Sequence, residues 1–223
     1  MSARLLLIII FFTATNGLAR QPSYYNQDAV WQKELCGNPF SAGICDSLIE
    51  ADKLKRYPEI VKRSGDSLIL KLANGDSLIL VNFRRNGEGI QYNSFREFYP
   101  ELGYYLICRR FYEGWDFILI DTETGNSTQL YAHPLFSPDF GRFVTAVADL
   151  VAGYRPNGVW IYKIAESDII LEWSFDSGSN VGFDDAVWLD TTIIALNQVV
   201  TPNDRKNSML LKKGEKGWEL LEK

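Results

Sequence analysis

An acidic, glycine-containing stretch at residues 176–185 is the part of the sequence best suited to hold a cation. Its oxygen-bearing side chains recur at short intervals and comprise Asp176, Asn180, Asp184 and Asp185. Calcium prefers carboxylate and amide oxygens as ligands, and glycine lets a loop fold closely around the ion. The stretch lacks the full spacing of a calcium-binding loop and its terminal glutamate, so a solvated turn is the alternative. No other cofactor is indicated.

The remaining titratable residues offer few routes to catalysis. The chain contains one histidine, which excludes a metal site built from several histidines. A serine triad would have to use His133, which precedes a proline at an expected strand-to-turn junction. Glycoside hydrolysis needs two carboxyl groups about 5–10 Å apart. Glu166, Asp168 and Asp149 could supply such a pair only if the fold brought two of them together, so no catalytic residue is assigned.

Aromatic side chains form the second group of candidates, because they make up 13% of the chain. Tyr104, Trp115 and Tyr154 lie near the ends of expected strands, where a sugar or a peptide could stack on an exposed ring. Packing between neighbouring sheets uses the same residue types. The sequence therefore leaves two roles open for these three residues, ligand binding and core packing.

The three cysteines favour one short-range disulfide. Cys36 and Cys45 are separated by a glycine- and proline-containing loop, which a disulfide can close in an oxidising compartment. Cys108 stands in an apolar strand and is expected to be a buried, unreactive thiol. A pairing of Cys108 with one of the other two cysteines stays open.

The N-terminal residues indicate export from the cytoplasm. Arg4 precedes an apolar run at residues 5–12, and small residues lead up to Ala19, which is typical of a signal peptide cleaved after that residue. The run is too short to anchor the mature chain across a bilayer. We therefore expect a periplasmic or secreted protein with a signal peptide at residues 1–19, a helical lead-in at residues 20–60 and a β domain at residues 61–223.

Two copies of one short phrase define the strand pattern around the candidate residues. Residues 98–105 and 136–143 both read aromatic, any residue, proline, acid, apolar, glycine, any residue, aromatic. Proline presets the first corner of a turn, and we expect glycine to take a positive φ at its exit. Each copy should therefore lead into a new strand, at residues 104–111 and 143–148.

Further strands are expected between and before these copies. Residues 115–121 and 127–131 read as a hairpin with glycine in its turn. The sequence Gly-Asp-Ser-Leu-Ile-Leu occurs at both 65–70 and 75–80, and an Asn-Gly pair between the copies favours a second hairpin.

Helical spacing is confined to residues 28–35 and 45–57. In the second segment the apolar side is expected to face the β domain and comprises Ile44, Leu48, Ala51 and Leu54. The opposite, polar side comprises Glu50, Asp52, Lys53 and Lys55.

The second phrase resembles the Ser-Pro-Asp-Gly turn of TolB-like propeller repeats, and Trp160-Ile161-Tyr162 resembles the inner strand that follows it there. The chain departs from that pattern because Phe140 is inserted between Asp139 and Gly141. The resemblance, with short strands at near-regular spacing, implies an all-β, propeller-like antiparallel meander of roughly four blade-like units behind a short helical segment. Such a set could form a small propeller or an open stack of sheets.

These observations favour a binding or scaffolding module for a protein partner in the cell envelope. The formal net charge of -5 and the lack of a Lys/Arg cluster argue against nucleic-acid binding. The alternative is a cell-envelope hydrolase acting on glycan or peptide through paired carboxylates or a bound calcium ion. The sequence does not decide the oligomeric state.

Overall fold

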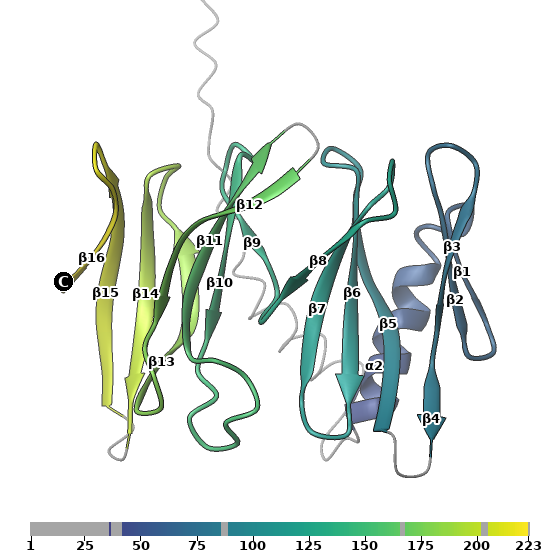
Figure 1. Ribbon diagram of the computed structural model, residues 1–223, viewed down its shortest axis with the longest axis horizontal. Coiled ribbons are helices and arrows are strands. Elements are labelled where there is room, and N and C mark those ends of the chain that lie inside the picture. The colour runs from purple at the N-terminus through teal and green to yellow at the C-terminus, as the bar shows by residue number, and fades with distance from the viewer. Residues whose placement is uncertain (1–35, 37–41, 86–88, 166–167, 202–204, 223) are drawn as a thin grey trace, which may run out of the picture.

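The computed structural model describes residue 36 and residues 42–85, 89–165, 168–201 and 205–222 (Figure 1). Within these ranges it contains helix α2 (Ala42–Leu54) and sixteen strands in four antiparallel sheets. The expected signal peptide and the expected helix at residues 28–35 lie outside the described residues. The fold is therefore established for the β domain and for the end of the helical lead-in.

Each sheet is a meander of strands that follow one another along the chain. The first sheet consists of β1 (Val61–Ser64), β2 (Ser67–Lys71) and β3 (Ser77–Val81). The second consists of β4 (Phe83–Arg85), β5 (Gly89–Tyr99), β6 (Tyr104–Phe111), β7 (Trp115–Asp121) and β8 (Ser127–Leu130). The third consists of β9 (Leu135–Phe136), β10 (Arg142–Val147), β11 (Gly158–Ala165) and β12 (Asp168–Asp176). The fourth consists of β13 (Val181–Trp188), β14 (Ile193–Val200), β15 (Arg205–Gly214) and β16 (Gly217–Glu222).

The four sheets stand in chain order in a row, with α2 beside β5 (Figure 1). This arrangement confirms the predicted all-β antiparallel meander with a short helical segment, and the described strands form four sheets. Strands β6 and β7 coincide with the predicted residues 104–111 and 115–121. Both hairpins also form, since β2 pairs with β3 and β7 pairs with β8.

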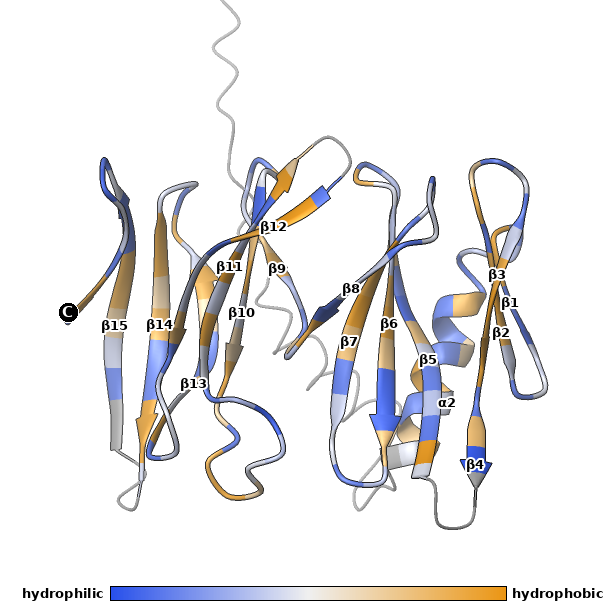
Figure 2. Ribbon diagram, viewed as in Figure 1, coloured by the Kyte–Doolittle hydropathy of each residue, from blue (hydrophilic) through white to orange (hydrophobic). Residues whose placement is uncertain are grey.

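Apolar side chains fill the spaces between successive sheets. One cluster lies between the first and second sheets, where Leu68 packs near Tyr105. Another joins the second and third sheets and includes Leu106 and Phe143, and a third, including Phe183, joins the third and fourth. In Figure 2 the strands carry most of the hydrophobic colour. Burial of apolar surface between sheets is therefore the main force that holds the described sheets together.

The two copies of the turn phrase differ in how they reverse the chain. Gly103 has a φ of 68° and donates its N–H to the Tyr99 carbonyl at 2.9 Å, as predicted for the first copy. In the second copy the prediction is wrong, because Phe140 and not Gly141 has the positive φ, 56°. The Asp139 carboxylate accepts the Gly141 N–H at 3.1 Å, and the positive φ falls one residue earlier than expected.

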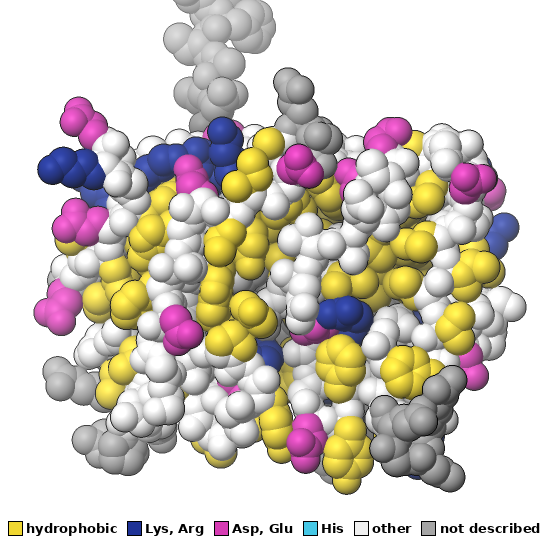
Figure 3. All heavy atoms as spheres, in the orientation of Figure 1, with side chains coloured by type: hydrophobic (Ala, Val, Ile, Leu, Met, Phe, Trp, Pro, Cys, Tyr) yellow, Lys and Arg dark blue, Asp and Glu magenta, His cyan; other side chains and the backbone are white. Residues whose placement is uncertain are grey.

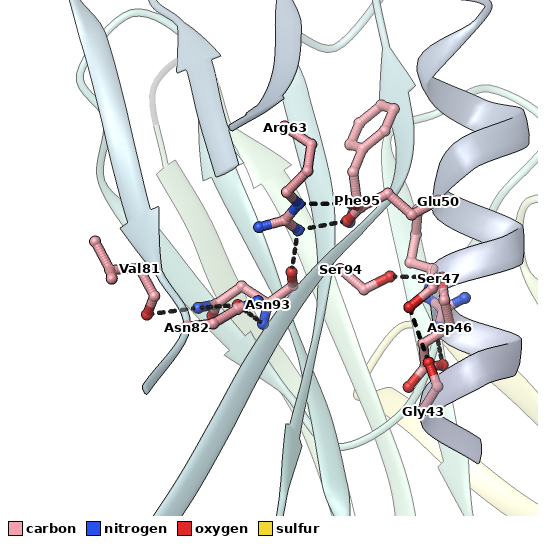
Figure 4. A network of polar contacts seen from close by, with 11 residues as sticks. Gly43, Asp46, Ser47, Glu50, Arg63, Val81, Asn82, Asn93, Ser94 and Phe95 are labelled. Carbon is pink, nitrogen blue, oxygen red and sulfur yellow. Dashed lines mark hydrogen bonds and ion pairs between the residues drawn. The ribbon is translucent and has the colours of Figure 1, made fainter. Parts of the chain in front are cut away.

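Helix α2 docks on the β domain through apolar and charged residues, so the predicted apolar contact is only partly right. Leu54 packs against the core between the first and second sheets as predicted, and Ile49 is buried too. Ile44 and Leu48 are 64% and 41% exposed, whereas Glu50 and Lys53 are buried. The Glu50 carboxylate accepts hydrogen bonds from Arg63 Nε at 2.7 Å and Nη2 at 2.6 Å. Figure 4 shows these contacts between the helix and the sheets. The helical pattern could not reveal this orientation, because the partner arginine belongs to another element, β1, 13 residues further along the chain.

Further charged contacts extend along the same side of the helix. Lys53 Nζ lies 2.6 Å from a Glu97 carboxylate oxygen, and Asp46 pairs with both Arg96 and Arg110. The predicted disulfide between Cys36 and Cys45 is present and joins the first turns of α2 to the preceding chain. Cys108 is a free thiol, and its pKa is raised by burial, which agrees with its predicted unreactive role.

Glu172 links the third and fourth sheets. Its carboxylate accepts hydrogen bonds from Arg142 Nε at 2.7 Å, Lys213 Nζ at 2.6 Å and Trp218 Nε1 at 3.1 Å. Desolvation alone raises the pKa of Glu172, but these three donors outweigh it and lower the pKa from 4.5 to about 2. The ionised carboxylate of Glu172 is therefore stabilised in the folded state relative to the unfolded state.

Replacement of Glu172 by glutamine is expected to lower the unfolding free energy at neutral pH by about 2 kcal/mol, after allowance for solvent screening. Because the folded-state pKa is depressed, this stabilisation is present above pH 4.5 and declines as the pH falls towards 2. Urea unfolding of both proteins across this range measures the difference. The exposed Glu219→Gln variant serves as the control, and a difference that does not change with pH would contradict the prediction.

Candidate functional site

A row of aromatic and arginine side chains crosses the second sheet at one end. Tyr92, Arg110 and Trp115 lie in register on β5, β6 and β7. Strand alternation places them on the same face as Cys108 and Phe117, which belong to the core shared with the third sheet. The row therefore lies at the solvent-exposed end of the interface between the second and third sheets, where Trp115 is 39% exposed.

The loop between β10 and β11 completes this surface. Arg155 places its guanidinium 4.1 Å from the centre of the Trp115 ring, and Arg110 lies 5.7 Å from the same ring. Tyr154 packs closely against Gly114. A Cβ added to Gly114 would lie 3.3 Å from the Cβ of Tyr154. The close contact leaves no room for a larger residue in the β6–β7 turn, so the turn and the loop are fitted to each other.

Asp149 holds this loop in shape. Its Oδ2 accepts the backbone N–H groups of Tyr154 and Arg155, each at 3.0 Å, and lies 3.6 Å from the Arg155 Nε. The Asn157 side chain accepts the Asp149 N–H from the other end of the loop. Asp149, considered from sequence as a glycosidase carboxylate, therefore positions the arginine that stacks on Trp115.

We define the Trp115 surface by its six members, which are Tyr92, Arg110, Tyr112, Trp115, Tyr154 and Arg155. Tyr112 belongs to the β6–β7 turn and is 80% exposed, and Tyr154 is 54% exposed. The surface therefore presents the Trp115 ring, which is held by backbone register and by arginine stacking, together with exposed tyrosines. Cation–π contacts of this kind contribute about 0.5–2 kcal/mol each.

A cavity of about 580 Å³ lies beside the Trp115 surface, where α2 and the second, third and fourth sheets meet. Acidic and basic side chains alternate on its wall, and Asp46 contacts Arg96 and Arg110 at once. His133 also lines it, with its ring edge-on to Phe117 at 5.5 Å. The cavity is thus polar and charged on one side and continuous with the aromatic core on the other.

The predicted aromatic candidates fall into two groups. Trp115 and Tyr154 meet at the Trp115 surface. Tyr104 lies at the other end of β6, where it pairs with Asp121 and is buried in the core. Burial, followed by the charges of Asp121 and Asp168, raises the pKa of Tyr104. The structure places Tyr104 in core packing and the other two residues at an exposed surface.

The predicted cation ligands do not form one cluster. Asp176 accepts the Gly178 N–H at 3.0 Å in a turn, and the Asn180 carbonyl accepts the Thr201 N–H at 3.0 Å. Asp184 and Asp185 lie at a bulge in β13 and line the cavity. Among the described residues there is no group of three or more acidic, histidine or cysteine side chains that could hold a metal ion.

The other carboxylates considered for hydrolysis are dispersed. Asp168 begins β12, whereas Asp149 belongs to the β10–β11 loop at the cavity wall. Glu166 lies outside the described residues. Sequence reasoning did not identify Arg155, Arg110 or Asp46 as site residues. The adjacent pair Arg109-Arg110 was one sequence signal for this site, because neighbouring residues of a strand face opposite sides of the sheet and one of the two must face the site. Arg110 faces the site, and Arg109 pairs with Asp116 on the opposite side of the sheet.

A scan against protein-family models and a search of curated proteins gave no match to this chain. In the described part of the chain, no helix has the length and apolar character needed to cross a membrane.

Proposed function

We propose that the chain is an exported, propeller-like binding module that captures a protein partner in the cell envelope through the Trp115 surface. The observation that carries this proposal is the exposed Trp115 ring held under Arg155 at 4.1 Å beside an exposed tyrosine. Tryptophan, tyrosine and arginine are the residue types that contribute most to protein–protein binding energy. A fixed ring also loses little conformational entropy when a partner covers it.

Two sequence features support the location. The N-terminal pattern with cleavage after Ala19 is typical of exported proteins. The disulfide between Cys36 and Cys45 is of the kind that persists in an oxidising compartment. The resemblance of residues 136–143 to TolB-like repeats is consistent with a propeller-type scaffold that presents loops to a partner.

The proposal is tested by placing a photo-crosslinking amino acid at the position of Tyr112 or Tyr154 in intact cells. A matched control carries it at Leu189, which is exposed to a similar degree in the β13–β14 turn. We expect one partner to be crosslinked from both tyrosine positions and not from the control. Equal crosslinking from all three positions would indicate non-specific contact and contradict the proposal.

The Trp115→Ala variant is then expected to weaken binding of that purified partner by about 30-fold or more, as truncation of a central tryptophan costs about 2 kcal/mol. The thermal midpoint is expected to fall moderately, because the variant also loses the contacts of Arg155 and Arg110 with the ring. Leu189→Ala is expected to leave the affinity unchanged. Isothermal titration calorimetry measures both variants, and unchanged affinity in Trp115→Ala would rule out the Trp115 surface.

A further inference from the structure

The outer edge of the third sheet is a long apolar strand. Strand β12 has nine residues and pairs on one side with β11. Within the described residues no backbone hydrogen bond is made from its other side. Ile170 and Leu171 are each 51% exposed, and Phe175 is also exposed. In Figure 3 apolar side chains gather over β12 on the face towards the viewer.

The outer edges of the neighbouring sheets differ from β12. Strand β8, at the edge of the second sheet, has four residues and the sequence Ser-Thr-Gln-Leu. Strand β16, at the edge of the fourth, has six residues and carries Glu219 and Glu222. Short length and charge are the usual means by which proteins prevent edge strands from pairing with other chains. Strand β12 is longer, and three of its six exposed residues are apolar and lie between its acidic ends.

Apolar side chains project from both faces of β12. Leu171 pairs with Tyr162, which belongs to the core between the second and third sheets. Phe175 pairs with Val159, which belongs to the core between the third and fourth sheets. A strand added to this edge could therefore place alternate side chains against apolar surface on both faces of the sheet.

Glu172 does not block this edge with its charge. It is the extra residue of a bulge, since Leu171 pairs with Tyr162 and Trp173 with Ile161. Its carboxylate is bound by Arg142 and Lys213 between the sheets. The bulge divides the edge into two ladders, residues 168–171 and 173–176, and four residues are enough for a short strand to pair.

The charges at the two ends of β12 indicate which strand it fits. If two copies paired antiparallel along the whole strand, Asp168 of one copy would face Asp176 of the other. Like charges directly opposite each other destabilise a pair of strands. A partner strand with basic residues at its ends would instead face Asp168 and Asp176 with opposite charge.

We propose that the β12 edge binds an extended peptide strand of another protein, with apolar residues at alternate positions and basic residues at its ends. The backbone of the peptide pairs with the unpaired side of β12, and its apolar side chains, which lie on one face, cover Ile170 and Phe175. This site is separate from the Trp115 surface and does not depend on the function proposed for it.

The probe is the blocked nine-residue peptide Lys-Val-Thr-Val-Thr-Val-Thr-Val-Lys, which matches the length of β12. It carries a fluorescent label, is titrated with the mature protein and is followed by anisotropy. We expect a dissociation constant on the order of 100 µM, which suits a transient contact. A control peptide carries N-methyl groups on the backbone nitrogens of its three central residues. This change removes hydrogen-bond donors from both edges of the peptide strand and keeps all its side chains. A second control replaces both lysines by glutamate. Each control is expected to bind at least about 10-fold more weakly.

On the protein side, the double variant Ile170→Thr/Leu171→Thr keeps β propensity but removes the exposed apolar groups. We expect it to bind the probe about 10-fold more weakly, whereas Leu189→Thr at an exposed site elsewhere should bind as the wild type does. Equal binding of the N-methylated peptide, or no binding of the probe at about 1 mM, would overturn the proposal. A wild-type dimer in sedimentation equilibrium that the double variant converts to a monomer would overturn it as well.

Discussion

Alanine at position 158 is expected to destabilise the protein by more than about 4 kcal/mol, which exceeds the effect of most single substitutions. Gly158 begins β11 with a φ of 150°, a conformation that residues with a side chain rarely adopt. A Cβ built there would lie 2.0 Å from the Phe175 carbonyl oxygen and 3.2 Å from the Asp176 Cα. Because these atoms are backbone, the clash can be relieved only by moving β12 away from β11.

Gly43→Ala is the matched control for this substitution. Gly43 lies in α2, and no atom comes within 4 Å of the position of an added Cβ. Alanine has the higher helix propensity, so this variant is expected to be as stable as the wild type or more stable by up to about 1 kcal/mol. Urea unfolding followed by circular dichroism measures both variants. A Gly158→Ala protein within about 1 kcal/mol of the wild type would show that the β11–β12 contact is looser than described.

Strand positions could be predicted because their signals are local. Strands β6 and β7 match the predicted bounds, since each is a run of apolar and aromatic residues that ends at a glycine-containing turn. The turn at Phe140 was missed because its geometry depends on the hydrogen bonds that Asp139 makes, and not on residue types alone. The expected number of units followed from the length of residues 61–223 at about 40 residues per unit. The row in which the sheets stack depends on contacts between sheets, which the sequence does not show.

The orientation of α2 could not be predicted because its partners are distant in sequence. The helical pattern assigns apolar residues to the inside, and this rule fails when acids meet buried arginines. Asp46 contacts Arg96 and Arg110, which lie 50 and 64 positions further along the chain. The spacing of apolar residues within the helix cannot indicate such contacts.

The candidate site was predictable only in part for a similar reason. Aromatic type and strand-end position selected Trp115 and Tyr154 correctly as exposed residues, but the same criteria selected Tyr104, which is buried. Register decides between them, because Tyr104 and Arg110 occupy opposite ends of β6. The stacking of Arg155 on Trp115 depends on a loop that Asp149 shapes through backbone contacts, which residue types do not disclose.

Removal of the Glu50 carboxylate is expected to cost about 3–5 kcal/mol, the range for breaking a buried ion pair by deleting one partner. Glu50 accepts two hydrogen bonds from Arg63 and one from the Phe95 N–H at 2.8 Å. The Glu50→Ala variant leaves the guanidinium and this N–H without the carboxylate, in a place that solvent hardly reaches. Urea unfolding of the disulfide-bonded protein measures the loss.

Asp52→Ala provides the comparison on the same helix. Asp52 pairs with Lys55 at 4.0 Å and with Arg56 at 3.5 Å on the exposed side, where such pairs contribute about 0–1 kcal/mol. Aspartate is a poorer helix former than glutamate, so Asp52→Ala gains more helix propensity, by a few tenths of a kcal/mol. After this correction the difference between the two variants reports the buried contact. Equal losses in the two variants would contradict docking of α2 through Glu50.

A double variant separates the value of the ion pair from the cost of leaving one charge behind. In Glu50→Leu/Arg63→Met both charges are replaced by apolar groups, and such replacements of buried pairs are often neutral or stabilising. We expect the double variant to be more stable than Glu50→Ala, with a remaining loss of about 1–3 kcal/mol for the unpaired Phe95 N–H. If the double variant were the less stable of the two, the attraction between Glu50 and Arg63 would itself be the main source of stability at this contact. The charged side of α2 would then stabilise the docked helix directly, beyond fixing its orientation.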